Sequence, residues 1–194
     1  GVVDNAQIRL VAIDIYDNHG IGYGEYFSVT DNTPPEVSVD TPIDIGIADT
    51  LLISWEANDN TGVASNVIYF SSDNGETFGL LDSIVADISR AGHSVSRSGD
   101  NSRSGHRTFF DYSWVVPNLV SDQCLIQIIS YDLVDLSTSD TSGFFSIYDE
   151  TPPQISVLSP NAGHSIPEYN DLTVSWEASD NIEMDSVQIY YSND

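Results

Sequence analysis

The sequence predicts an all-β protein built from β-sandwich units, and three observations support this fold class. Apolar and polar residues alternate along many short segments, which is the pattern of strands that bury one face. Clusters rich in Asp, Asn and Gly, such as residues 59–62 and 72–75, separate these segments and are typical of turns. No segment keeps the 3.6-residue period of an amphipathic helix.

The chain contains an internal repeat. Residues 54–60 (SWEANDN) recur 121 positions later as SWEASDN, and residues 31–35 (DNTPP) recur 118 positions later as DETPP. A repeat of about 120 residues in a chain of 194 predicts one complete unit between two partial ones. We therefore interpret the chain as a window on a longer protein.

The repeat divides the chain into three parts. We expect residues 1–32 to be the end of a first unit, residues 33–150 to be a complete unit, and residues 151–194 to be the beginning of a third unit. Neither partial unit could close a sandwich alone, since each would expose half a core.

The alternation assigns an inward face to each expected strand. Each tryptophan falls on such a face, which favours core packing over a platform for sugars. Tyr69, Phe109 and Tyr190 are expected to point outward. The expected inward residues, in chain order, are Ala6, Ile8, Leu10; Ile53, Trp55, Ala57; Asn66, Ile68, Phe70; Phe110, Tyr112, Trp114; Cys124, Ile126, Ile128; Val174, Trp176, Ala178; and Val187, Ile189, Tyr191.

One segment departs from the strand pattern. Residues 89–107 are rich in Ser and Gly and almost free of large apolar side chains, so we expect a long loop before the next strand. The segment holds four of the five arginines: Arg90, Arg97, Arg103 and Arg107. This cationic loop could dock on the acidic surface of a neighbouring copy or bind a polyanionic glycan; the alternative is a solvated insertion.

The order of these features resembles fibronectin type III domains and the related Ig-like repeats of bacterial surface and secreted proteins. The resemblance rests on the Pro-Pro pair at 34–35, the segment LLISW at 51–55, the turn DNTGV at 59–63 and the strand and turn at 67–75. It implies tandem Ig-like or fibronectin III-like β-sandwiches, one complete and two partial. On this template residues 1–32 would be strands F and G of the first unit, residues 33–150 a complete sandwich, and residues 151–194 strands A to C of the third unit. Such motifs specify an architecture rather than an activity.

Composition excludes several function classes. The formal net charge is -25, from 30 acidic residues against five arginines, so the chain as a whole disfavours binding to nucleic acid. No apolar run is long enough to cross a membrane, and the single cysteine, Cys124, can form no disulfide within the chain. Signatures of serine hydrolases, zinc proteases, nucleotide-binding loops and dinucleotide folds are missing, so we predict no catalysis by this segment.

The strongest candidate site is a calcium site at one pole of the complete sandwich. On the sandwich template, the entering linker, the loop after strand B and the loop after strand F meet at this pole, and all three carry carboxylates. Calcium prefers six to eight oxygen ligands. Asp and Asn also occur in turns for conformational reasons alone, which is the alternative for each position. The candidate ligands are Asp31, Asn32, Asp59, Asn60, Asp132 and Asp135, with the third-unit equivalents Asp149, Asp180 and Asn181.

These features predict a non-catalytic structural segment of an extracellular stalk, adhesin or filament, stiffened by calcium at the junctions between repeats. Its expected partners are neighbouring repeats or copies of itself, with a glycan or cell-surface ligand as a further option. The alternative function is an accessory, glycan-binding module of a large secreted hydrolase. A catalytic domain elsewhere in the same protein would distinguish the second prediction from the first.

Overall fold

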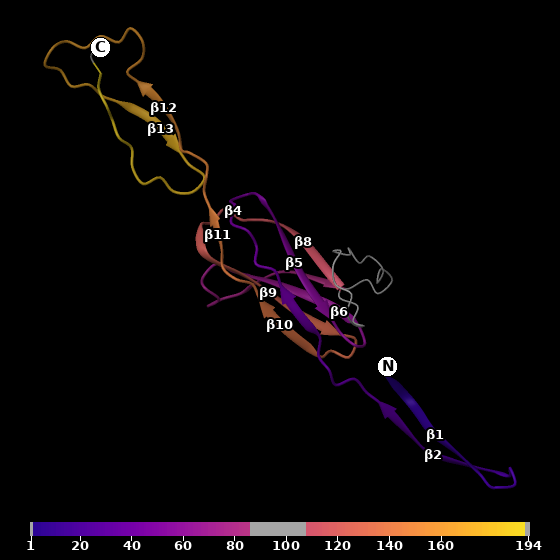
Figure 1. The fold of residues 1–194 in the computed structure, drawn as a ribbon. Coiled ribbons are helices and arrows are strands. Elements are labelled where there is room, and N and C mark those ends of the chain that lie inside the picture. Colours follow the sequence, from indigo (N-terminus) through magenta and orange to yellow (C-terminus); the bar gives the residue numbers. More distant parts are fainter. Residues whose placement is uncertain (1, 86–107, 193–194) are drawn as a thin grey trace.

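The computed structural model describes residues 2–85 and 108–192, and within these ranges the protein consists of strands, turns and irregular segments without a helix. Accordingly, the described part of the chain holds no helix of the length and hydropathy that a membrane crossing requires. Figure 1 shows a central sandwich with a hairpin at one end and a two-stranded sheet at the other. The predicted arginine-rich loop, with Arg90, Arg97, Arg103 and Arg107, lies outside the described residues.

Two sheets form the central sandwich. The first has the order β3-β5-β8, with β3 at Glu36–Val39, β5 at Thr50–Asn58 and β8 at Thr108–Val115. The second has the strand order β4-β11-β9-β6-β7, and a further strand, β10, pairs antiparallel with β9. Its strands are β4 (Ile45–Gly46), β6 (Val63–Ser71), β7 (Gly79–Val85), β9 (Ser121–Asp132), β10 (Ser137–Thr141) and β11 (Phe145–Tyr148). This is the predicted all-β, Ig-like sandwich architecture.

The predicted inward faces of the sandwich are confirmed. Ile53, Ile68 and Ile126 are each 0% exposed, and Trp55 is 1% exposed in the middle of the same core. Trp55 stacks on Phe110 of β8 with ring centroids 5.4 Å apart, and Trp114 packs on Phe70 of β6 at 4.7 Å. Three of the four aromatic side chains of β8, Phe110, Tyr112 and Trp114, therefore lie against the core, and Phe109 is exposed, as the alternation predicted.

The strands at the two ends have no opposing sheet among the described residues. β1 (Val3–Ile13) and β2 (His19–Val29) form a hairpin, in which Ile8 and Leu10 are 55% and 69% exposed. Their counterparts in β9, Ile126 and Ile128, are fully buried. The two strands of the hairpin therefore form as predicted, but no second sheet of the described residues covers the face that was predicted to be buried.

In the last part of the chain, too, a face that was predicted to be buried is exposed. β12 (Gln154–Ser159) pairs with β13 (Ser175–Ser179), and Trp176 in β13 remains 38% exposed. The prediction that Trp176 fills a core is wrong for the described chain, because a core requires a second sheet and only a two-stranded sheet is present there.

The strand predicted around Val187, Ile189 and Tyr191 is also wrong, since residues 180–192 carry no strand. In the sandwich the equivalent strand, β6, is held by β7 on one side and β9 on the other. Residues 180–192 have no such neighbours among the described residues, and an extended segment without ladder partners is not stabilised as a strand.

Candidate metal centre

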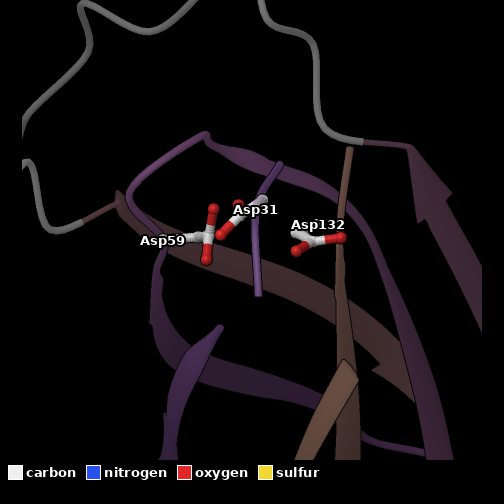
Figure 2. A group of neighbouring side chains, drawn as sticks. All are labelled: Asp31, Asp59 and Asp132. Carbon is white, nitrogen blue, oxygen red and sulfur yellow. The ribbon is translucent and has the colours of Figure 1, made fainter. Parts of the chain in front are cut away.

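Three acidic side chains from separate segments meet at the pole of the sandwich where the chain enters. Asp31 lies in the linker between β2 and β3, Asp59 lies just after β5, and Asp132 is the last residue of β9. Figure 2 shows the carboxylate of Asp31 between those of Asp59 and Asp132. These are the three segments that the sequence predicted would converge.

The spacing of the three carboxylates suits a single cation. One oxygen from each of Asp31, Asp59 and Asp132 lies within 4.8 Å of the others. Two oxygens on opposite sides of one calcium ion lie about 4.6–5.2 Å apart, because each calcium–oxygen bond is about 2.3–2.6 Å long. The group could therefore supply three ligands to one ion without a change in the backbone.

Asp31 is held by donors from both the linker and the β5–β6 loop. Its Oδ1 accepts the Thr33 backbone N–H at 3.0 Å and the Asn60 side-chain amide at 3.2 Å, and its Oδ2 accepts the Thr61 hydroxyl at 2.8 Å. The Thr33 N–H, followed by the Thr61 hydroxyl, lowers the pKa of Asp31 below its usual value. Asp31 is therefore a fixed and ionised group that ties the linker to the sandwich.

Asp59 organises the β5–β6 loop with one of its oxygens. Its Oδ1 accepts the backbone N–H groups of Thr61 at 2.7 Å and Gly62 at 3.0 Å, and it lies 2.8 Å from the Thr61 hydroxyl. Gly62 has a φ of 110°, a left-handed conformation that favours glycine. The other oxygen, Oδ2, is buried and has no hydrogen-bond partner.

Asp132 is the most enclosed member of the group, with an exposed fraction of 1%. Its Oδ1 accepts the backbone N–H groups of Val134 and Leu136, each at 2.8 Å, which closes the turn between β9 and β10. Its Oδ2 is buried without a partner. Among the described residues there is one salt bridge, which joins His19 to Asp17. No arginine or histidine of the described residues therefore forms a salt bridge with any of the three carboxylates.

Asp135 is placed in the same turn but not in the group. It has a φ of 65°, and its equivalent in the first unit, Asp17, has a φ of 66°. Asp is one of the residues that tolerates this left-handed conformation, so the shape of the turn explains both positions. Asn32 is exposed, and the side-chain amide of Asn60 donates to Asp31.

The hairpin repeats this turn at its tip. Asp14 Oδ1 accepts the N–H groups of Tyr16 and Asn18, as Asp132 Oδ1 does for its own turn. Asp14 Oδ2 accepts the Asn18 side-chain amide at 2.8 Å, whereas the side chain of Leu136 at the matching position has no hydrogen-bond donor. Of these two turns, the one in the sandwich therefore leaves a carboxylate oxygen without a hydrogen-bond partner.

The second linker repeats part of the arrangement. Asp149 Oδ1 accepts the Thr151 N–H at 2.9 Å and the Asn181 amide at 3.1 Å, and these bonds, the Thr151 N–H first, lower the pKa of Asp149. Asp180 has one buried oxygen without a partner. Within the described ranges the three-carboxylate group occurs at the first linker and not at this one.

Thr61 is the site residue that the sequence analysis missed. Its hydroxyl contacts both Asp31 and Asp59, each at 2.8 Å. The repeat held a signal for this residue, since the position 121 residues later is Ile182, so the surrounding motif is repeated but the hydroxyl is not.

Comparison with known proteins adds one finding. A family model described as a bacterial Ig domain matches residues 153–194, the part of the chain that contains β12 and β13. The chain matches no curated protein. The match supports a bacterial Ig-like domain in this segment, and domains of that family are generally non-catalytic, structural or adhesion-type modules that are commonly surface-exposed.

Proposed function

We propose that this chain is a non-catalytic structural segment of an extracellular stalk, adhesin or filament, in which calcium stiffens the junction between repeated sandwich units. The family match, the all-β fold and the repeated linker motif support the structural role. In this role each sandwich serves as a spacer between neighbouring repeats.

The acidic pole supports the calcium part of the proposal. An ion bound to Asp31, Asp59 and Asp132 would join the linker to two loops of the sandwich at once. The linker then continues into Pro34 and the buried Pro35, whose rings restrict the backbone. The hairpin on the other side of the linker would therefore keep one orientation relative to the sandwich.

The observation that carries this proposal is the state of Asp132. Asp132 is 1% exposed, one of its carboxylate oxygens has no hydrogen-bond partner, and two further carboxylates lie within ligand distance. An ionised carboxylate removed from water requires a compensating charge or hydrogen bonds on its oxygens. A divalent cation bound by all three carboxylates supplies that charge.

Isothermal titration of the full chain with calcium tests the site. We expect Asp132→Asn to weaken calcium binding at least about tenfold, because it removes a ligand charge from the group. Asp135→Asn is the matched control, since it makes the same change three residues away in the same turn, and it should leave the affinity within about twofold. No binding by the wild-type chain, or equal loss in both variants, would overturn the site.

A further inference from the structure

The Thr61 hydroxyl is the one side-chain group of the described residues that contacts two members of the carboxylate group. It lies 2.8 Å from Asp31 Oδ2 and 2.8 Å from Asp59 Oδ1. Asp31 belongs to the linker and Asp59 to the β5–β6 loop, so a single hydroxyl joins the two segments.

The hydroxyl has one proton for these two acceptors. Asp59 Oδ1 already accepts the N–H groups of Thr61 and Gly62, whereas Asp31 Oδ2 accepts no second hydrogen bond from the described residues. The proton is therefore best donated to Asp31, and the hydroxyl oxygen then faces the second carboxylate without a proton between them. A cation among the carboxylates offsets the resulting repulsion between oxygen atoms.

The second linker shows the same motif without this group. The amide–carboxylate bond from Asn60 to Asp31 recurs from Asn181 to Asp149, but Ile182 stands where Thr61 would be. At that linker the two carboxylates, Asp149 and Asp180, are not bridged by a hydroxyl.

We propose that Thr61 is the positioning residue of the cation site and makes cation binding and attachment of the linker one event. The inference rests on the proposed calcium site, and it names the residue that determines the affinity of this site for calcium. Thr61 donates its hydroxyl proton to Asp31 and its backbone N–H to Asp59, so it holds both carboxylates at ligand distance before the ion arrives and reduces the ordering that binding would otherwise require.

Calcium titration of the full chain with Thr61→Val and Thr61→Ser tests the inference. Valine keeps the branched shape and the backbone N–H that bonds Asp59, and it removes only the hydroxyl. We expect Thr61→Val to weaken calcium binding at least about fivefold, since a hydrogen bond to a charged group is lost, and Thr61→Ser to restore most of the affinity. Thr77→Val is the matched control, because the Thr77 hydroxyl bonds Asp73 outside the group and its loss should leave calcium affinity unchanged.

A second measurement does not depend on the ion. In calcium-free buffer, an NMR titration of the Asp31 carboxyl should give a higher pKa in Thr61→Val than in wild type, because the hydroxyl bond that stabilises the charged form is gone. Thr61→Ser should keep the wild-type pKa. The same spectra show whether each variant is folded.

The outcomes separate the two proposals. Calcium binding by wild type with equal affinity in Thr61→Val overturns the role of Thr61 and leaves the calcium site standing. No calcium binding by wild type overturns both. An unchanged Asp31 pKa in Thr61→Val shows that the hydroxyl does not position Asp31, and it contradicts the inference whatever the calcium affinity.

Discussion

At the scale of single residues, the same residue type serves different purposes within one turn. Asp132 and Asp135 are three positions apart, and the sequence predicted both as ligands. The structure buries Asp132 to 1% exposure with a free oxygen, whereas Asp135 is exposed with a φ of 65°. The difference arises from which side chain faces the interior, and this depends on the strand that precedes the turn.

Burial at neighbouring positions of β5 leads to a direct prediction about stability. Ile53→Ala should lower the free energy of unfolding by about 2–5 kcal/mol, because Ile53 is 0% exposed and its loss leaves a cavity. Leu52→Ala is the control on the same strand, since Leu52 is 57% exposed, and it should cost less than about 1 kcal/mol. Urea unfolding followed by Trp fluorescence measures both, and a cost for Leu52→Ala equal to that for Ile53→Ala would contradict the assigned faces.

The sequence predicted the faces of the sandwich strands because alternation follows directly from the geometry of a strand. β4 was missed by the sequence analysis, because a strand of two residues is too short to show an alternating pattern. At β4 the chain passes from the first sheet to the second, and Ile45 pairs in parallel with Ile147 of β11. The repeat also does not show that the sandwich has two strands, β10 and β11, where the first part of the chain has one, β2. Between β10 and β11, Ser142 accepts the Ile126 N–H at 3.0 Å.

At the scale of elements, the turn between β6 and β7 depends on a carboxylate. Asp73 accepts bonds from the Ser71 hydroxyl at 2.6 Å, the Thr77 hydroxyl at 2.5 Å and the Thr77 N–H at 3.0 Å. These bonds, with Ser71 first, lower the pKa of Asp73 to about 2 from an ordinary value of 3.8. The turn is therefore stabilised by the ionised form.

This shift predicts a pH dependence. Since the pKa of Asp73 is lower in the folded state, its contribution to stability is complete above about pH 4 and disappears as the pH falls through about 2. We expect Asp73→Asn to be less stable than wild type at pH 7, with the difference shrinking between about pH 4 and about pH 2. Urea unfolding of both proteins across this range measures it, and an equal difference at pH 7 and pH 2 would refute the role of the charge.

At the scale of the whole molecule, the acidic pole lies where the linker from the hairpin reaches the sandwich (Figure 1). If calcium fixes this junction, small-angle scattering of the full chain should give a larger maximum dimension with calcium than with EDTA, both at constant ionic strength. Constant salt is required because a net charge of -25 makes the overall shape sensitive to screening.

The Asp132→Asn variant is the control for this measurement, because it should show the same maximum dimension with calcium and with EDTA. An unchanged maximum dimension in wild type would count against a calcium-stiffened junction even if calcium binds.

The sequence by itself determined the all-β class, the repeat and the inward faces of the sandwich strands, because alternation and repeat spacing are local properties of the chain. The meeting of Asp31, Asp59 and Asp132 was predicted from the sandwich template that the family resemblance implies. Only the tertiary structure decided which predicted faces are covered: Trp55 is buried and Trp176 is not, although both lie in the same motif. It also decided that Thr61 bridges two carboxylates and that Asp135 stands apart. Burial and side-chain contacts depend on segments distant in sequence, and local patterns carry no information about whether those segments are in place.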